Sequence, residues 1–512
     1  MWSWRPTPEA LPAWRGGTES TVGRVVVIGG GISGLAAAWE LSGGREGVDA
    51  HPDATFGSGA HVIVLESTSR LGGALDSAKF GGRIVDTGPD GFLGRRPEAL
   101  DLCREIGLAG ALVPIGGRGA GVWARGSVRP LPAGLALGIP TRFWPAARSG
   151  ILGLRGQLGL ARDALLPRPD TRGPLGDRAI GPLVVRKLGQ RVADRLVDPL
   201  IGGIHAGSVD DMSAAATYPP LLAAAQRRGS LMRALRAEVP APTDDAPPLF
   251  WAVNGGMAAM VEQLRSALAA RGVEIQCGLT VEGLERPGPS HGRGAGWNVL
   301  ASRPEKAGHA YRRSIGADAV VLAVPAPVAS ALLAPHDDEA ADLLGGIAYA
   351  SVTLVTFRAP ADALASPLAG TGFLVPRRSA PPVGHDAWAV TAVTYLSEKW
   401  PHLAAEGEVL LRASVGRYGD DRAASWSDDE VVARAWRELG QLMGLRGDPV
   451  ESMVSRWPRA FPQYRVHHLM RTAGIEAAVA RIGGIAVAGS AYRGVGIPAC
   501  IASGRAAAQA IA

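Results

Sequence analysis

Three closely spaced glycines near the start of the chain have the spacing of a phosphate-binding turn. They are Gly29, Gly31 and Gly34 of the stretch RVVVIGGGISGLAAAWEL, which begins at Arg24. The β-branched run before them is typical of a buried parallel strand, and the alanine-rich run after them is typical of a helix. In this context the first glycine permits the tight turn, the second admits a pyrophosphate, and the third lets helix and strand pack closely. The pattern therefore predicts a dinucleotide-binding unit.

A carboxylate follows the next apolar run. In HVIVLES, residues 62–65 predict a second buried strand, and Glu66 stands at its end. A carboxylate at this place can accept both ribose hydroxyls of an adenosine, although a solvated charge at a strand end would have the same sequence. The separation from Gly34 is longer than usual. The segment GGREGVDAHPDATFGSGA, from Gly43, is expected to be a surface insertion that accounts for the excess.

Composition excludes several classes of protein. The 512 residues are 47% hydrophobic and 20% charged, which is typical of a globular protein with sizeable cores. The net charge is +6, but no basic run is interleaved with aromatic residues, so we expect no nucleic-acid partner. Cys103, Cys277 and Cys500 are far apart and lack CxxC spacing, so neither a disulfide framework nor a metal site is predicted.

The sequence contains no pattern typical of a secretory signal or a membrane span. Its longest apolar stretch, AVVLAVPAPVASALLAP, is interrupted by three prolines and is shorter than a bilayer requires. Residues 1–22 lack the apolar core of a secretory signal and are expected to be a disordered leader. We therefore expect a cytoplasmic location.

The rest of the chain supplies the elements that must position these residues. LFWAVNGGMAAMVEQLRSALAARGVEIQCGLTVEGLE predicts a turn, an amphipathic helix and a strand, and ADAVVLAVP predicts another buried strand. The helical spacing of apolar and charged positions over residues 142–235 predicts a helical subdomain. The alternating runs YASVTLVTF and AWAVTAVTYL predict strands of a sheet over the site, and segments between Arg286 and Ser314 predict hairpin turns.

A second glycine turn and five further motifs resemble one family. RLGG, from Arg70, and VDTGPDGFL, from Val85, resemble the signature of FAD-dependent amine oxidases and their relatives. The later motifs, in chain order, are LPAGLALGIPT, RLVDPLIGGIHAGSVDDMSAAATYP, GFLVP, RWPRAFPQYRVHH and AYRGVGIPACIASGRAAA. Together they resemble the porphyrinogen oxidases of haem biosynthesis, which act on protoporphyrinogen or coproporphyrinogen III. The resemblance runs from about Arg24 to the C-terminus.

The resemblance implies FAD as the cofactor and gives each motif a place along it. The residues implied at the pyrophosphate and ribose are Gly29, Gly30, Gly31, Ile32, Ser33, Gly34, Glu66 and Ser67. The residues implied along the rest of the cofactor are Arg70, Gly73, Ala74, Gly88, Pro89, Asp90, Gly91, Val281, Trp457, Ser490, Val495, Gly496 and Ile497. Val281 would contact the adenine through its backbone, and the C-terminal turn would face the polar end of the flavin. Relatives often carry Asp or Asn where this chain has Ala499, which removes a polar group here.

The implied fold class is α/β, with a discontinuous Rossmann-like FAD-binding domain, a β-sheet substrate domain and a helical subdomain. The FAD-binding domain is expected to comprise residues 23–100, 236–335 and 481–512. The substrate domain is expected at residues 101–141 and 336–480. The helical subdomain would occupy residues 142–235, after a leader at residues 1–22.

The sequence predicts no catalytic side chain and no metal ligand. The resemblance implies that the flavin takes a hydride from a methylene bridge of the porphyrinogen, in three rounds for each tetrapyrrole. Oxygen would then reoxidise the flavin, with hydrogen peroxide as the by-product. Because the substrate carries propionates, cations should line its pocket. Arg95 and Arg96 are the first candidates, and Arg142 is a third.

The choice of substrate rests on the resemblance as well. GIPTRF and the overall pattern resemble the enzymes of Gram-positive bacteria, which implies coproporphyrinogen III, with protoporphyrinogen IX as the alternative. An amine oxidase or carotenoid desaturase would share the FAD motifs but lack GIPT and PLIGGIHAG, and a non-catalytic flavin-binding scaffold would lack a reactive pocket. The expected partners are the porphyrinogen and oxygen, with peripheral contact at the inner face of the membrane and transient contact with the next haem-pathway enzyme.

Overall fold

The computed structural model describes residues 23–43, 60–166, 176–227, 229–239, 247–287, 296–304, 310–379 and 387–511. Three features expected from the sequence lie outside the described residues. They are the leader, nearly all of the insertion after Gly43, and the turns expected at residues 288–295 and 305–309.

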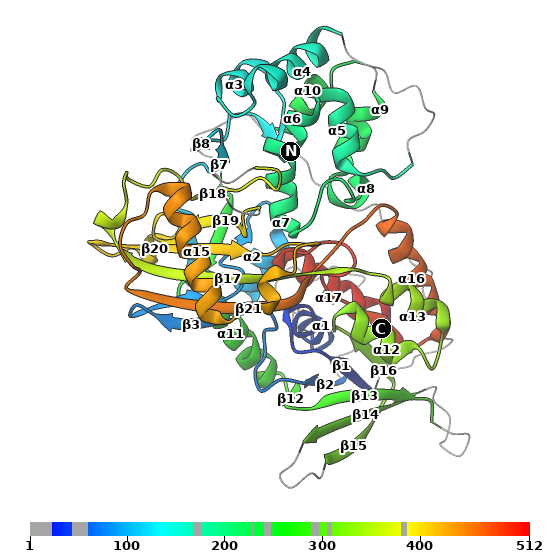
Figure 1. The fold of residues 1–512 in the computed structure, drawn as a ribbon. Helices are drawn as coiled ribbons and strands as arrows, with labels where there is room; N and C mark the ends of the chain where they lie inside the picture. The colour runs from blue at the N-terminus through cyan, green and yellow to red at the C-terminus, as the bar shows by residue number, and fades with distance from the viewer. Residues whose placement is uncertain are drawn as a thin grey trace.

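A five-stranded parallel sheet lies at the centre of the dinucleotide-binding part (Figure 1). Its order is β12–β2–β1–β16–β22, with β1 at Arg24–Ile28, β2 at His61–Glu66, β12 at Glu274–Cys277, β16 at Ala319–Leu322 and β22 at Ile485–Val487. The strands predicted at residues 25–28 and 62–65 are confirmed. Val25, Val26 and Val27 are fully buried because both faces of the sheet are covered.

Four helices share the hydrophobic core on one face of this sheet: α1 (Ile32–Leu41), α2 (Pro97–Glu105), α11 (Met257–Ala270) and α17 (Ile497–Ile511). α1 and α17 are in close backbone contact, since a Cβ on Gly504 would lie 2.0 Å from the Ser33 carbonyl oxygen. α1 is equally close to its own strand, because a Cβ on Gly34 would lie 1.9 Å from the Gly29 carbonyl oxygen. Glycine is therefore required at both contacts.

The other face is covered by a small antiparallel sheet and three helices. The strands are β13 (Thr280–Glu285), β14 (Trp297–Pro304) and β15 (Ala310–Ala317), and the helices are α12 (Ala326–Leu333), α13 (Asp338–Gly345) and α16 (His468–Ile482). They share one core with Val26 and Ile28. The antiparallel pairing of β13 with β14, and of β14 with β15, agrees with the predicted hairpins.

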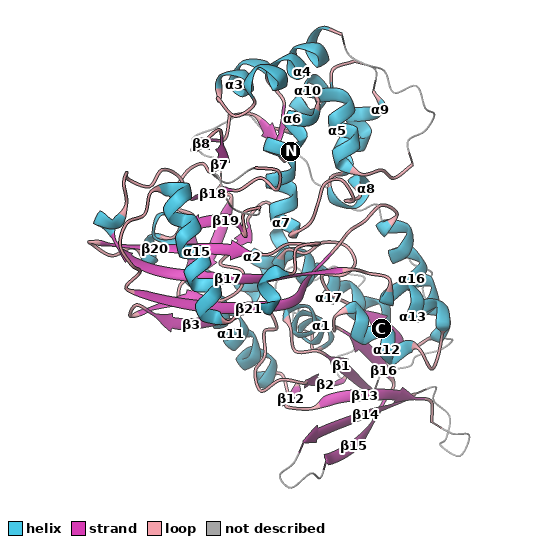
Figure 2. Ribbon diagram, in the orientation of Figure 1, coloured by secondary structure: helices cyan, strands magenta, loops and turns pink. Residues whose placement is uncertain are grey.

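A seven-stranded sheet forms the second part of the molecule, at the left of Figure 2. Its order is β21 (Glu451–Pro462), β17 (Tyr349–Pro360), β20 (Glu408–Val415), β19 (Val390–Tyr395), β18 (Gly372–Leu374), β7 (Gly121–Ala124) and β8 (Ser127–Pro130). The two alternating runs of the sequence form β17 and β19, as predicted. α15 (Asp428–Met443) shares a core with this sheet and begins at a capping box between Ser427 and Glu430.

The third part is helical and lies above the other two in Figure 1. It contains α3 (Phe143–Arg148), α4 (Gly153–Leu165), α5 (Ile180–Leu188), α6 (Gln190–Val192), the π-helix η2 (Ala193–Gly202), α7 (Gly203–His205), α8 (Ala214–Thr217), α9 (Pro219–Gln226), α10 (Leu231–Ala234) and the 3-10 helix η3 (Leu235–Glu238). No helix in the described ranges combines the length and apolar content needed to cross a bilayer.

Two segments pack differently from the expected division into domains. Of residues 101–141, the end of α2 and strand β6 (Leu112–Pro114) join the dinucleotide side, where β6 pairs with β11 (Phe250–Val253). α16 packs on α13 and β22 instead of on the seven-stranded sheet, because its buried residues Ile475, Ala478 and Val479 belong to that core. Sequence spacing alone does not reveal which core an apolar helix face joins.

Candidate functional site

One cavity of about 550 Å³ joins the three parts of the molecule, and its size is typical of ligand pockets. On the dinucleotide side it is lined by Gly31, Ile32, Ser33, Gly72, Ala74, Leu75, Gly88, Pro89, Gly489, Ser490, Val495, Ile497 and Cys500. Its other walls include Asp198, Gly202, Ala206, Val375, Thr391, Arg412, Arg417, Trp457 and Arg459. Ten of the residues predicted for the cofactor therefore line one space: Gly31, Ile32, Ser33, Ala74, Gly88, Pro89, Trp457, Ser490, Val495 and Ile497.

The glycine turn leaves room for a ligand beside the N-terminus of α1. Gly29 has φ +108°, and a Cβ there would lie 2.3 Å from the Ala323 carbonyl oxygen, so a side chain is excluded. A Cβ on Gly31 would meet no atom within 4 Å. Gly31 is also the N-cap of α1, and no side chain caps that helix. Free backbone N–H groups facing an open space suit an anionic group such as a pyrophosphate.

Glu66 is held at the end of β2 by two backbone N–H groups and by the Ser67 hydroxyl. Its Oε2 accepts a hydrogen bond from the Gly30 N–H at 2.8 Å, and its Oε1 accepts one from the Thr68 N–H at 2.8 Å. The Ser67 hydroxyl donates to Oε1 at 3.3 Å. A carboxylate has about four lone-pair sites and three are occupied here, so Oε2 keeps capacity for one hydroxyl donor. Its geometry suits a ribose.

The second glycine turn lies against the first. The Gly72 N–H donates to the Gly30 carbonyl oxygen at 2.8 Å, and Gly72 and Gly73 both have positive φ. The guanidinium of Arg70 donates to the carbonyl oxygen of Gly73 at 2.8 Å, so this exposed arginine braces its own loop. Val281 lies in β13, two residues after Leu279, whose N–H donates to the Glu66 carbonyl oxygen at 3.0 Å. The roles implied for these residues at the adenosine end stay predictions.

Asp90 and Gly91, which the resemblance places along the flavin, do not line the cavity. Asp90 is buried, and its carboxylate is bound by Lys399 Nζ at 3.0 Å, Arg412 Nη2 at 3.1 Å and Trp400 Nε1 at 3.0 Å. Burial would raise the pKa of Asp90, but these two cations and the hydrogen bonds hold that pKa well below its usual range. A Cβ on Gly91 would meet the Trp400 ring at 2.7 Å.

The cluster around Asp90 holds the loop that carries Gly88 and Pro89 into the cavity. Arg412 Nη1 donates to the carbonyl oxygens of Gly88 at 3.0 Å and Asp86 at 3.3 Å. Lys399 and Arg412 give no local motif in the sequence, because they reach Asp90 from segments about 300 residues away.

The C-terminal turn is fixed by two aromatic residues from a neighbouring segment. The Tyr464 hydroxyl donates to the Ser490 carbonyl oxygen and accepts a hydrogen bond from the Gly494 N–H at 2.7 Å. The His468 ring stacks on Tyr464 with ring centres 4.0 Å apart. Both residues lie in the motif RWPRAFPQYRVHH, although the sequence does not reveal that they brace this turn. Gly496 does not line the cavity, and a Cβ there would meet only Pro498 at 3.8 Å.

A bulge in β21 brings Trp457 and Arg459 to the cavity. Residues 458–460 interrupt the pairing between β17 and β21, and the Arg459 N–H donates to the Ser351 hydroxyl at 3.0 Å. Arg459 has φ +47°, a conformation that non-glycine residues rarely adopt and that concentrates at functional sites. Trp457 Nε1 donates to the Thr87 carbonyl oxygen at 2.7 Å, next to Gly88.

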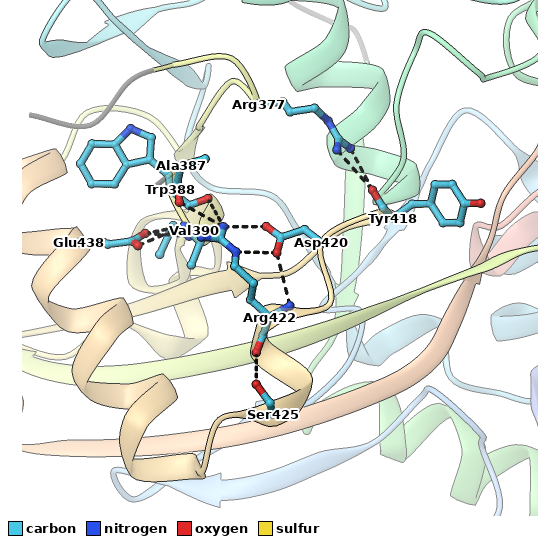
Figure 3. Close-up of polar contacts among 10 residues, drawn as sticks. Arg377, Ala387, Trp388, Val390, Tyr418, Asp420, Arg422, Ser425 and Glu438 are labelled. Atoms are coloured by element: carbon cyan, nitrogen blue, oxygen red, sulfur yellow. Dashed lines mark hydrogen bonds and ion pairs between the residues drawn. The ribbon is translucent and has the colours of Figure 1, made fainter. Parts of the chain in front are cut away.

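Arg417 approaches the cavity from the loop after β20. Figure 3 shows how this loop is held: Arg377 donates to the Tyr418 carbonyl oxygen at 3.3 Å, and Arg422 binds Asp420 at 2.8 Å. Burial and the nearby charge of Arg377 lower the pKa of Arg417 to about 10, so it stays protonated at neutral pH. Among the described residues, Arg417 and Arg459 have no ion-pair partner, so their charges are available to a ligand.

Arg95 and Arg96, the predicted substrate residues, lie outside the cavity. Arg96 Nη2 forms an ion pair with Glu98 Oε1 at 2.6 Å at the start of α2, and Arg95 is exposed. Arg142, the third candidate, is exposed at the N-cap of α3 and does not line the cavity either. Cations do line the cavity, but they are Arg417 and Arg459 and not the predicted arginines. Arg417 comes from the loop after β20, and Arg459 comes from the bulge in β21.

Comparison with known proteins identifies the family. The family described as flavin containing amine oxidoreductase matches residues 32–512. The chain belongs to this flavin-containing amine oxidoreductase family. Its cofactor is FAD, which fits the open turn at Gly31, the uncapped N-terminus of α1 and the free capacity of Glu66.

Several relatives place the chain with the porphyrinogen oxidases of this flavin-containing family. It is 35% identical to a coproporphyrinogen III oxidase of Mycobacterium bovis, over 94% of this chain and 95% of that protein. It is 31% identical to one from Propionibacterium freudenreichii, over 98% and 93%. A crystal structure from Exiguobacterium sp. 255-15, provisionally named a protoporphyrinogen oxidase, is 30% identical with a TM-score of 0.80 and covers 97% of this chain and 99% of that one. The protein is an FAD-dependent oxidoreductase.

Proposed function

We propose that this flavoprotein oxidises coproporphyrinogen III to coproporphyrin III, with oxygen as the final acceptor and hydrogen peroxide as the by-product. Relatives named coproporphyrinogen III oxidase support the substrate, since they match nearly the whole chain. The observation of the site that supports a propionate-bearing substrate is the pair Arg417 and Arg459, which line the cavity and have no carboxylate within ion-pair distance among the described residues. A substrate with four propionates can satisfy them.

We assign three tasks to the residues around the cavity: they bind the cofactor, orient the porphyrinogen and exclude water from it. When bound, FAD supplies a hydride acceptor, which is the chemistry that no side chain of the chain offers. Gly88, Pro89 and Trp457 form a rigid wall on the cofactor side, because Arg412 and the Thr87 carbonyl oxygen fix their positions. Arg417 and Arg459 would hold substrate carboxylates at the rim. Val352, Leu354 and Val375 give the apolar macrocycle a surface from which water is excluded.

Protoporphyrinogen IX is the second candidate substrate. The apolar side chains of the cavity favour it, and the Exiguobacterium relative carries the name of that activity. It has vinyl groups in place of two propionates, so a cation that faces a vinyl would lose its partner.

Steady-state kinetics on both porphyrinogens test the choice. We expect a higher kcat/KM with coproporphyrinogen III, and oxygen consumption that yields hydrogen peroxide in proportion to product. Equal or better efficiency with protoporphyrinogen would favour the second candidate. Failure with both would reject the proposed function.

Arg417 provides a sharper test of the same choice. Arg417→Met should raise KM for coproporphyrinogen III more than KM for protoporphyrinogen IX, by roughly tenfold, the scale of one charged hydrogen bond. The control is Arg378→Met, since Arg378 is bound to Asp194 and Asp210 outside the cavity. An equal change of KM for the two substrates would contradict the assigned role.

We further propose peripheral contact with the inner face of the membrane. Leu154, Leu158 and Leu165 are exposed along α4, and Arg155 is exposed beside them. An apolar stripe with flanking arginine suits an anionic bilayer surface. Cosedimentation with phosphatidylglycerol vesicles tests this contact, and no binding by the wild type would reject it. Transient contact with the next haem-pathway enzyme is proposed as well, and crosslinking during turnover tests it.

A further inference from the structure

A carboxylate that the cofactor motifs do not involve lies in the wall of the cavity. Asp198 and the following Pro199 both line the cavity, within the π-helix η2. π-Helical turns are rare and occur frequently at functional sites. Gly202 and Gly203 line the same wall. Because they have no side chains, they do not cover the carboxylate of Asp198 on the cavity side.

The contacts of Asp198 leave part of its carboxylate available. Its Oδ1 accepts a hydrogen bond from the Val209 N–H at 3.3 Å. Its Oδ2 accepts none from the described residues. No cation lies within ion-pairing distance of it in the described parts of the chain, in contrast to Asp90, whose carboxylate is fully engaged. Asp198 is thus an acid in the cavity that can still accept a proton or a hydrogen bond.

Charged groups from several elements surround Asp198. Arg377 lies after β18, Arg417 lies after β20, and Asp210 lies beyond α7. Burial raises the pKa of Asp198, and the two arginines offset part of that rise while Asp210 adds to it. A carboxylate with a raised pKa accepts a proton more readily near neutral pH than an exposed one does.

We propose that Asp198 accepts a proton from a pyrrole N–H of the porphyrinogen during each oxidation. The proposal rests on the proposed function and adds a named proton acceptor to it. A macrocycle seated between the FAD turn and η2 would lie against the wall that carries Asp198, which is the one acidic residue among the described residues that line the cavity. Pyrrole N–H groups are donors only, so a carboxylate is the matching partner.

The step balances in protons and electrons. The C–H bond of a methylene bridge breaks, and its electron pair leaves with the hydrogen as hydride to the flavin. The N–H bond of a pyrrole breaks, and the proton forms an O–H bond with Asp198. The loss of the two hydrogens adds one double bond: a C=C bond forms at the former methylene bridge, the ring double bonds shift, and the pyrrole nitrogen forms a C=N bond. Over the three rounds, one proton of the remaining methylene bridge moves to a nitrogen by tautomerisation, so the product has four methine bridges and keeps two N–H groups. Asp198 then releases the proton to solvent and is ready for the next round.

The test compares Asp198→Asn with a matched variant of the same helix. Asp194→Asn is the control, because Asp194 also lies in η2 but pairs with Arg378 and does not line the cavity. With coproporphyrinogen III we expect Asp198→Asn to lower kcat by about 100-fold, the scale of general base catalysis, with little change in KM. The control should match the wild type.

The pH profile separates proton transfer from a structural role. The wild-type kcat should fall on the acid side as Asp198 becomes protonated, at a pH above the ordinary carboxyl range because burial raises its pKa. Asp198→Asn should lack this limb, and Asp198→Glu should restore it together with part of the rate. Fluorescence titration with coproporphyrin III provides a readout independent of turnover, and Asp198→Asn should bind this product as the wild type does.

The outcomes of these experiments distinguish failure of the proposed function from failure of the role of Asp198. If the wild type oxidises neither porphyrinogen, the proposed function fails and the role of Asp198 fails with it. If the wild type is active and Asp198→Asn keeps the rate and the acid limb, only the role of Asp198 is overturned. Loss of product binding in Asp198→Asn, without recovery of the acid limb in Asp198→Glu, would also overturn proton transfer by assigning the residue to the shape of the pocket.

Discussion

The two buried carboxylates Glu66 and Asp90 have different roles, one in ligand binding and one in stabilising a loop. Glu66 accepts hydrogen bonds from neutral backbone donors, so its charge is available to ribose hydroxyls. Asp90 is engaged by Lys399 and Arg412, so it stabilises a loop and cannot serve a ligand. The sequence places both in motifs of FAD-dependent enzymes. Their difference depends on the cations, which arrive from distant segments.

Glu66→Ala tests the ribose contact. We expect FAD retention to weaken by roughly 1–3 kcal/mol, the scale of a lost charge-assisted hydrogen bond. Flavin content after dialysis and equilibrium titration of the apoprotein measure it. Glu274→Ala on the neighbouring strand β12 is the control, because Glu274 is partly exposed and bonded to Gln276. Full flavin content and unchanged affinity in Glu66→Ala would reject the assignment.

Asp86 makes stability depend on pH. Burial raises its pKa from 3.8 to about 6, although hydrogen bonds from Ser77 and the Met257 N–H oppose the rise. Its folded-state pKa exceeds the unfolded value, so its contribution to stability is complete below about pH 4 and is lost as pH rises through 6. Asp86→Asn keeps an acceptor oxygen and removes this dependence.

The prediction for Asp86 is that the difference in free energy of unfolding between the wild type and Asp86→Asn changes with pH. Between pH 4.5 and pH 7.5, wild-type stability should fall relative to Asp86→Asn by about 2 kcal/mol, from 1.36 kcal/mol for each pH unit between 4.5 and the folded-state pKa of about 6. Urea unfolding of both proteins at the two pH values measures it. A stability difference that stays constant with pH would contradict the prediction.

At the scale of elements, the close contact of α1 with α17 completes the cofactor site. The first turn of α1 carries Gly31 and the first turn of α17 carries Ile497, and both residues line the cavity. Gly504 lies against the Ser33 carbonyl oxygen, so the short distance between the two helices requires a glycine at position 504. Any side chain there separates the two halves of the site.

Gly504→Val tests this contact. A Cβ would lie 2.0 Å from the Ser33 oxygen, so α17 must shift, and we expect loss of bound flavin together with a lower unfolding midpoint. Flavin absorbance and thermal unfolding measure the two effects. Ala506→Val on an exposed position of α17 is the control and should retain flavin. Normal flavin content in Gly504→Val would show that the helix contact is not required.

Elements built on local patterns could be predicted, and elements that depend on distant partners could not. The runs at residues 25–28 and 62–65 have the apolar pattern of buried strands, and they form β1 and β2. The bulge at residues 458–460 gives no such pattern, because it exists only relative to the partner strand β17. The π-helix η2 has helical spacing but an unusual hydrogen-bond register, which residue types do not reveal. The cavity cations Arg417 and Arg459 therefore lie where no local sequence pattern indicates them.

At the scale of the whole molecule, a buried charge cluster ties α1, α2 and α17 together. Arg505 on α17 binds Glu105 at 2.6 Å and lies 3.7 Å from Glu40. Trp39 Nε1 donates to the same Glu105 oxygen at 2.8 Å. All three charged side chains are less than a tenth exposed. Removal of the cation would leave two buried carboxylates close together without the positive charge of Arg505.

Arg505→Met should therefore destabilise the fold strongly. We expect a loss of about 3–5 kcal/mol, the scale for breaking a buried ion pair by removing one partner. Urea unfolding followed by circular dichroism measures it. Arg265→Met is the control, because Arg265 pairs with Glu262 on the exposed surface of α11, where ion pairs contribute little. Equal stability of the two variants would contradict the prediction.

The central sheet also has a consequence for the order of events during synthesis. β1 and α1 leave the ribosome early, whereas β22 and α17 follow after more than four hundred further residues. Contacts between such distant segments form slowly. The part of the flavin pocket formed by β1 and α1 therefore stays incomplete until β22 and α17 have been synthesised and have packed against it. We therefore expect the nascent chain not to retain FAD before β22 and α17 have been made. We expect FAD to bind the completed polypeptide, and we expect a protein truncated before Ile485 to gain no bound-flavin absorbance when FAD is added.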